Sequence, residues 1–140
     1  MINDIIKQAL PYGFSYLFAT YKEADYEVDK CKDFPICLHV AQIAGVFDIS
    51  DLGILIDSQD VMLVFLDIDK KGSADSEHSG EIIERMKQGA VKLIGELNRS
   101  GLVEQITGNV KYSTVVKDFN KCLTGIAIQL TIKPTAAVCL

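Results

Sequence analysis

Residues 61–66 read Val-Met-Leu-Val-Phe-Leu, an unbroken run of large apolar side chains between Asp60 and Asp67. A short continuous apolar run is typical of a strand whose two faces are both covered, whereas a half-exposed strand alternates with polar residues. The run therefore predicts a central strand, with other strands on both sides and further layers above and below it.

Downstream of this run, residues 79–100 carry the clearest helical pattern in the chain. Apolar side chains recur with a period of 3.6 residues and so fall on one face of a helix; they are Ile82, Ile83, Met86, Ala90, Leu93, Ile94 and Leu97. Gly101 follows as a helix-ending glycine would. A shorter apolar pattern over residues 3–10 predicts an N-terminal helix.

Other strands are predicted at residues 36–43, 110–116 and 123–133. In the last of these, Ile126, Ile128, Leu130 and Ile132 alternate with smaller or polar residues, as in a half-exposed antiparallel strand. Residues 55–57 are a possible short pairing segment, Gly45 and residues 48–53 predict a turn or a bulged hairpin, and residues 21–34 predict an exposed connection or a short strand.

Together these elements predict an α+β fold. We expect an antiparallel sheet of four to five strands, with the N-terminal helix and one long central helix packed on one face. The length of 140 residues favours a single domain over residues 1–140.

The composition excludes several classes of protein. The chain is 49% hydrophobic with 14 Lys and Arg against 19 Asp and Glu, which argues against disorder and against a basic nucleic-acid-binding surface. Its uncharged stretches are shorter than the ~20 residues that cross a bilayer, and its first residues do not resemble a signal peptide, so we expect a cytoplasmic protein without membrane contact. The four cysteines, Cys31, Cys37, Cys122 and Cys139, fit no zinc spacing and are expected to be free thiols.

One stretch resembles a calcium-binding loop. Asp67, Asp69 and Asp75 occupy positions one, three and nine of such a loop, with Gly72 at position six. Lys71 at position five and His78 at position twelve replace ligands that calcium requires, and the element before the loop is a predicted strand. A solvated loop without metal is therefore the preferred interpretation.

No catalytic constellation emerges from the sequence. Cys37 and His39 lie two residues apart and so face the same side of a strand, but neither a third orienting group nor an oxyanion site accompanies them. A buried thiol beside a packed imidazole explains the pair better. We expect no catalytic residue, no cofactor and no metal. Lys70, Lys71, Lys87, Lys92 and Arg99 alternate with glutamates and are expected to form a salt-bridged helix face.

The second half of the chain resembles a known group of proteins. Leu97-Asn-Arg-Ser-Gly-Leu102 is followed by Ile106-Thr-Gly-Asn-Val-Lys-Tyr112 and by Phe119-Asn-Lys-Cys-Leu-Thr-Gly-Ile-Ala-Ile-Gln-Leu-Thr-Ile132. This order resembles neck, tail-terminator and head-completion structural proteins of tailed phages that infect Bacteroides-type bacteria. The resemblance covers Val61 to Leu140, and residues 1–60 match only in the order of their elements.

The resemblance implies a virion protein without catalysis. Such a subunit assembles into a homo-oligomeric ring, hexameric or dodecameric, at the head-tail junction, where it contacts neighbouring neck, portal or tail proteins and DNA passes without specific binding. The strand at residues 123–133 is expected to offer an exposed edge to a neighbour. The interface residues expected on this basis are Lys70, Lys71, Asp75, His78, Ile126, Ile128 and Gln129.

Two other functions remain open at this point. One is a small intracellular enzyme or ligand-binding domain with a pocket between sheet and helices. The other is an adaptor that binds one partner by strand addition and forms no ring.

Overall fold

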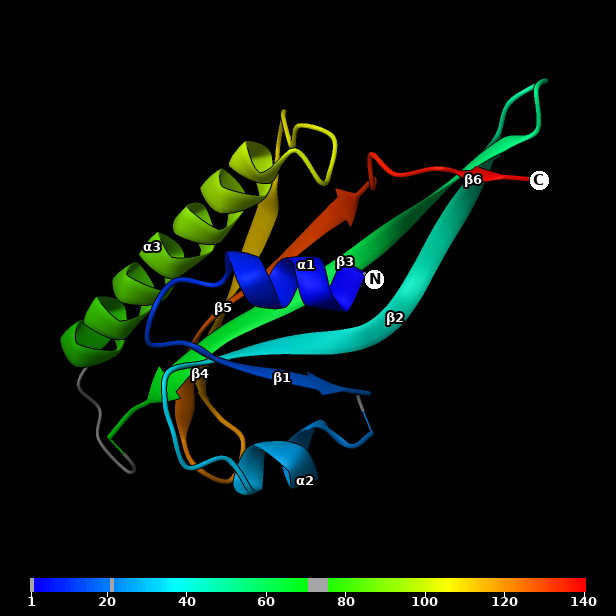
Figure 1. The fold of residues 1–140 in the computed structure, drawn as a ribbon. Coiled ribbons are helices and arrows are strands. Elements are labelled where there is room, and N and C mark those ends of the chain that lie inside the picture. The colour runs from blue at the N-terminus through cyan, green and yellow to red at the C-terminus, as the bar shows by residue number, and fades with distance from the viewer. Residues whose placement is uncertain (1, 21, 71–75) are drawn as a thin grey trace.

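The predicted central strand lies in the middle of a six-stranded sheet (Figure 1). The computed structural model describes residues 2–20, 22–70 and 76–140. Within them the helices are α1 (Ile2–Ala9), α2 (Ala24–Asp29) and α3 (Ser76–Ser100), and the strands are β1 (Ser15–Ala19), β2 (Ile36–Ile49), β3 (Ile54–Ile68), β4 (Lys111–Asp118), β5 (Leu123–Ile132) and β6 (Val138–Cys139).

The strand order in the sheet is β1-β2-β3-β5-β4, and β6 pairs with the start of β3. The pairs β2–β3, β3–β5, β4–β5 and β3–β6 are antiparallel, whereas β1 runs parallel to β2. The predicted α+β class is confirmed. The prediction of four to five antiparallel strands is wrong, because the short strands β1 and β6 join the sheet and β1 introduces a parallel pair.

One face of the sheet, which we call the first face, carries Val61, Leu63 and Phe65 of β3. These side chains are buried in one apolar cluster with Ile6 of α1 and Leu93 of α3. The period-3.6 stripe of α3 therefore meets the sheet as predicted, and α1 packs beside it on the same face. Burial of side chains of this size stabilises the fold by about 1.5–3 kcal/mol each.

The opposite, second face is covered by α2. Val64 and Leu66 of β3 belong to a second cluster with Ala24 and Val28 of α2. The interpretation of residues 21–34 as an exposed connection or a short strand is wrong for this part of the chain. Ala24 and Val28 are four residues apart, so a helix of six residues brings both onto the sheet.

Two glycines allow close packing in this core. A Cβ atom added at Gly125 of β5 would lie 1.7 Å from the carbonyl oxygen of Phe65, and one at Gly89 of α3 would lie 2.6 Å from the ring of Phe14. The contact at Gly125 is with backbone atoms, so a residue without a side chain is required there, whereas a side chain at Gly89 would force the Phe14 ring to move.

Among the described residues, no helix combines the length and apolar character needed to cross a membrane. The four cysteines are free thiols, of which Cys37 and Cys122 are buried and Cys139 is exposed.

Candidate functional site

The second half of β2 and the first half of β3 form a two-stranded arm, residues 44–58, that extends beyond the rest of the sheet (Figure 1). β1 pairs only with Ile36–Val40 of β2, and β5 pairs with β3 only from Gln59 onward. A shift in register between Val40 and Ala44 marks the point where the arm begins. The sequence predicted a turn or a bulged hairpin at Gly45 and residues 48–53. The hairpin with an irregular register is present, but its strands continue through most of that stretch and the turn itself is confined to Ser50–Gly53.

The tip of the arm is a tight turn at Ser50–Gly53. The Ser50 N–H donates to the Ile54 carbonyl at 2.9 Å, and Ser50 Oγ accepts the Ile54 N–H at 3.1 Å. Gly53 has a φ of +78°, which favours glycine. The Leu140 N–H donates to the Gly53 carbonyl at 2.8 Å, so the C-terminal segment with β6 lies along the arm.

The arm exposes large apolar side chains on both of its faces. The alternation of the paired strands places Phe47 and Ile49 on the first face and Val46 and Ile54 on the second. Together with the tip and the adjoining C-terminal segment, the exposed set is Val46, Phe47, Ile49, Leu52, Ile54, Val138 and Leu140. Exposed apolar residues that are gathered on one segment in this way mark contact surfaces for other proteins.

The arm also has an unpaired strand edge, and all of its charged side chains are acidic. Among the described strands, residues 44–49 of β2 pair only with β3, so their outer backbone groups are open to another strand. Residues 44–58 include Asp48, Asp51 and Asp57 but no lysine or arginine. Two arms laid against one another would therefore repel, and the arm is suited to a different surface of its partner.

The predicted interface residues do not form one surface. Lys70 and Gln129 are exposed and His78 is half-buried, whereas Lys71 and Asp75 lie outside the described residues. The prediction is wrong for Ile126 and Ile128, which are 1% and 3% exposed on the first face beneath α3 and cannot reach a partner in this fold.

The predicted exposed edge at residues 123–133 is also wrong. β5 lies between β3 and β4 and pairs with both, so its backbone is occupied along most of its length. Its alternating pattern holds only from Gln129 onward, and the residues before Gln129 are buried or half-buried. The edges of the sheet are β1 and β4.

The acidic stretch that resembles a calcium loop contains one buried carboxylate, Asp69. Ser79 Oγ and Thr124 Oγ1 each donate to Asp69 Oδ2 at 2.6 Å, and the Lys70 N–H donates to Oδ1 at 2.7 Å. Burial raises the pKa of Asp69, but these hydrogen bonds outweigh it and, with the charge of Lys117, lower the pKa to about 2. Through these hydrogen bonds Asp69 links the end of β3 to Ser79 of α3 and Thr124 of β5.

The other residues of the stretch that resembles a calcium loop either contact different partners or lie outside the described residues. Asp67 Oδ2 accepts a hydrogen bond from Arg85 at 2.9 Å, and His78 Nε2 lies 3.6 Å from Asp69 Oδ1. Lys71, Gly72 and Asp75 fall in the part that the structure does not describe. Within the described residues, no group of three or more His, Cys, Asp or Glu is placed to hold a metal.

Cys37 and His39 lie on the first face, as their spacing predicted. The Tyr16 hydroxyl is 2.7 Å from His39 Nδ1, and burial lowers the pKa of His39 to about 4 and raises that of Cys37. The His39 imidazole is therefore neutral and contacts Tyr16, and the Cys37 thiol stays protonated. A nucleophilic cysteine needs a lowered pKa, so the two residues are better explained as packed core side chains.

The predicted salt-bridged face of α3 is confirmed for Lys87 and Arg99. Lys70 lies before α3, and Lys71 falls outside the described residues. Lys87 Nζ lies 3.1 Å from Glu84, and Arg99 pairs with Glu96. These exposed pairs contribute little stability individually, and they leave α3 with a face of mixed charge.

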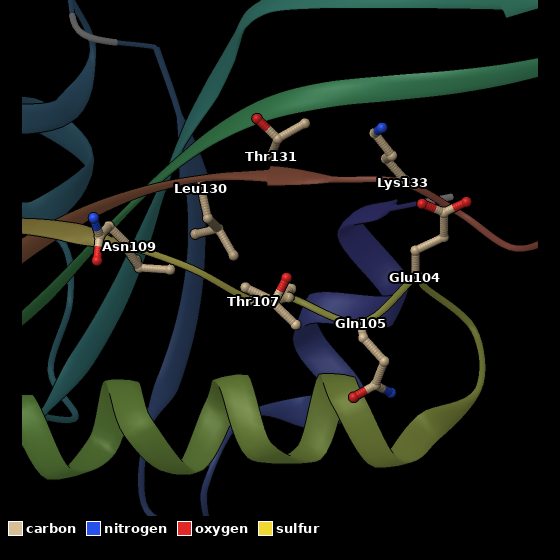
Figure 2. A pocket seen from close by; sticks show the side chains of 9 residues that line it. Glu104, Gln105, Thr107, Asn109, Leu130, Thr131 and Lys133 are labelled. Carbon is tan, nitrogen blue, oxygen red and sulfur yellow. The ribbon is translucent and has the colours of Figure 1, made fainter.

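A cavity of about 380 Å³ lies between residues 104–110 and the end of β5 (Figure 2). Glu104, Thr107, Asn109, Thr131 and Lys133 give it a polar lining. The Glu104 N–H donates to the Lys133 carbonyl at 2.7 Å, which closes one end of the gap. The described residues of the lining supply amide, hydroxyl and charged groups.

Neither a protein-family model nor a curated protein matches this chain.

Proposed function

We propose that this chain is a non-catalytic virion structural protein at the head-tail junction of a tailed phage, where it forms a homo-oligomeric ring as a tail terminator or head-completion subunit. The observation that carries the proposal is the arm. Its exposed apolar residues are not covered by any other element in the described part of the chain, and a subunit of a larger assembly buries such residues against its neighbours.

The geometry of the arm supports a ring rather than a symmetric dimer. The arm is acidic along its length, so two arms do not stack face to face, and a contact between the arm of one subunit and the body of the next is favoured. A contact between two different surfaces repeats from subunit to subunit and closes into a ring when the rotation allows it. The free edge of β2 supplies backbone groups for strand pairing with that neighbour.

The resemblance of residues 61–140 to phage neck proteins supplies the place in the virion. The formal charge of −5 is consistent with this place, because a lumen without attractive phosphate contacts lets DNA slide through. The protein would then reside in the host cytoplasm during assembly and in the virion afterwards.

The test is the native mass of the purified protein by light scattering, with negative-stain electron microscopy of the same sample. The proposal predicts particles of about six or twelve times the 15.4 kDa subunit, with a central channel. A monomer at every concentration reached would contradict self-assembly into a ring. Compact particles without a channel would contradict the place around DNA.

A further inference from the structure

The second face of the sheet contains a cavity of about 360 Å³ beside α2. Its floor is formed by neighbouring strands, with Leu38 of β2, Val64 of β3 and Ala127 of β5 in one paired row. Val40 and Met62 form the next row. The hollow exists because the row ends in small side chains, Ala127 and Ser113, where larger residues would fill the space.

The cavity is apolar at its floor and closed on two sides. Leu38, Val40 and Val64 line it and are buried, so they form its floor rather than its rim. α2 has only six residues and covers part of the face, and Phe119 from the turn after β4 forms the wall opposite. An apolar floor of this kind favours the hydrocarbon part of a ligand.

The rim of the cavity is acidic. Asp25 of α2 and Asp118 at the end of β4 line it from different elements, and the described residues of the lining include no lysine, arginine or histidine. Asp118 Oδ1 accepts the Phe119 N–H at 2.8 Å, which holds this carboxylate at the rim. The nearby Lys121 is directed elsewhere, since its Nζ donates to the Cys31 carbonyl at 2.6 Å.

We propose that this cavity binds a small apolar amine, whose hydrocarbon part occupies the floor and whose ammonium group lies at the carboxylates of Asp25 and Asp118. An apolar floor with an acidic rim selects a cation over an acid of the same shape. The same rim disfavours the arm of a second copy as the occupant, because that arm carries three aspartates and no basic residue. At about 360 Å³ the cavity is at the small end of ligand pockets, which fits a ligand built on one ring. This inference does not depend on ring assembly.

The test uses phenethylamine as the probe and 3-phenylpropionate as its counterpart of opposite charge. Both are titrated into the full chain while methyl NMR signals of Val40, Met62 and Val64 are followed. We expect saturable shifts with the amine, with a dissociation constant of about 0.1–10 mM, and binding of the acid that is weaker by about tenfold or more. Equal binding of the two probes, or no saturable shift up to about 20 mM amine, would overturn the proposal.

Variants locate the site. Asp25→Asn and Asp118→Asn are changes at exposed positions. Each should weaken the binding of phenethylamine by about threefold or more and reduce the difference in affinity between the amine and the acid. Asp57→Asn on the arm makes the same change of charge away from the cavity and should leave the affinity unchanged. If all three variants bind alike, the amine is not held at this rim.

A fourth variant, Ala127→Leu, fills the floor and should abolish binding while the rest of the methyl spectrum keeps its dispersion. Methyl shifts that follow protein concentration, without a response to the amine, would identify a second copy as the occupant and overturn the proposal. If Ala127→Leu fails to fold, the two rim variants still decide the outcome.

Discussion

β2 and β3 pair along nearly their whole length, yet the two ends of this ladder lie in opposite environments. Phe65, near one end, is 0% exposed between the helix layers, whereas Phe47, in the arm, is 67% exposed. Both are phenylalanines on the first face of the same pair of strands. The difference comes from what surrounds them, because β1, β5 and the helices cover one end and stop before the other.

This contrast separates residues that hold the fold from residues that are free to hold a partner. At the covered end, apolar side chains contribute to the stability of the single chain. In the arm, side chains of the same kind contribute little to it, and their presence is explained by a contact outside the chain. Substitutions at the two ends should therefore change different measured quantities.

The largest expected effect is at Phe65. Phe65→Ala should lower the free energy of unfolding by about 3–5 kcal/mol, because it removes a fully buried ring and leaves a cavity. Phe47→Ala is the matched control and should change the same quantity by less than about 0.5 kcal/mol. Urea denaturation of the two variants measures both, and equal losses would contradict the distinction between the two ends.

The second effect concerns the backbone at the covered end. Gly125→Ala should cost about 3 kcal/mol, because the new Cβ would lie 1.7 Å from the Phe65 carbonyl oxygen and β5 must move away from β3. Gly80→Ala in α3 meets nothing within 4 Å and should instead stabilise the chain by up to about 1 kcal/mol. Thermal unfolding of both variants tests this, and a stable Gly125→Ala protein would mean that the two strands approach less closely.

The third effect lies where β3 ends, at Asp69. Thr124→Val removes one donor to the buried carboxylate and should cost about 1.5–2 kcal/mol at pH 7. Because the pKa of Asp69 is lowered to about 2 in the folded chain, its contribution is fully present above about pH 4 and is lost as the pH falls towards 2. The difference in stability between wild type and variant should therefore shrink in acid. The part that remains comes from the Lys117 N–H, which loses Thr124 Oγ1 as its acceptor at 3.0 Å at every pH. A constant difference from pH 7 to pH 2 would show that the loss does not involve the charge of Asp69.

The smallest effect is expected at the tip of the arm. Leu52 is exposed and lies in the turn, so Leu52→Ser should change the free energy of unfolding by less than about 0.5 kcal/mol. A loss of more than about 1 kcal/mol would show that the arm is part of the cooperative core and would weaken its assignment as a contact surface.

The covered half of the molecule is the half that the sequence predicts well. Residues 61–66 read correctly as a central strand because their apolar run is uninterrupted, and α3 was visible because its apolar stripe spans many turns. β1 and α2 were missed because five or six residues carry too little periodicity. Their structure depends on tertiary contacts that local patterns do not contain.

The hairpin was among the predicted alternatives, but the length of its strands was not predicted, for a different reason. Gly45 and residues 48–53, with two aspartates, a serine and a glycine, have the composition of a turn, but only Ser50–Gly53 form one. Gly45 lies in β2, where a Cβ would be 2.7 Å from the Ser58 carbonyl oxygen, so the close approach of β3 explains this glycine. Exposed apolar side chains also resemble core residues in a sequence, since hydropathy does not reveal which of them another element covers. The same ambiguity led to the wrong assignment of Ile126 and Ile128 to an interface.

The central claim is that the apolar residues of the arm serve assembly and not folding. The most direct test is light scattering of the wild type, of the double variant Phe47→Ser/Ile49→Ser and of Val91→Ser, a similarly exposed apolar position on α3. We predict that the wild type and Val91→Ser form the same oligomer, while the double variant is a folded monomer with an unchanged circular dichroism spectrum. An oligomer of unchanged mass in the double variant would contradict the claim.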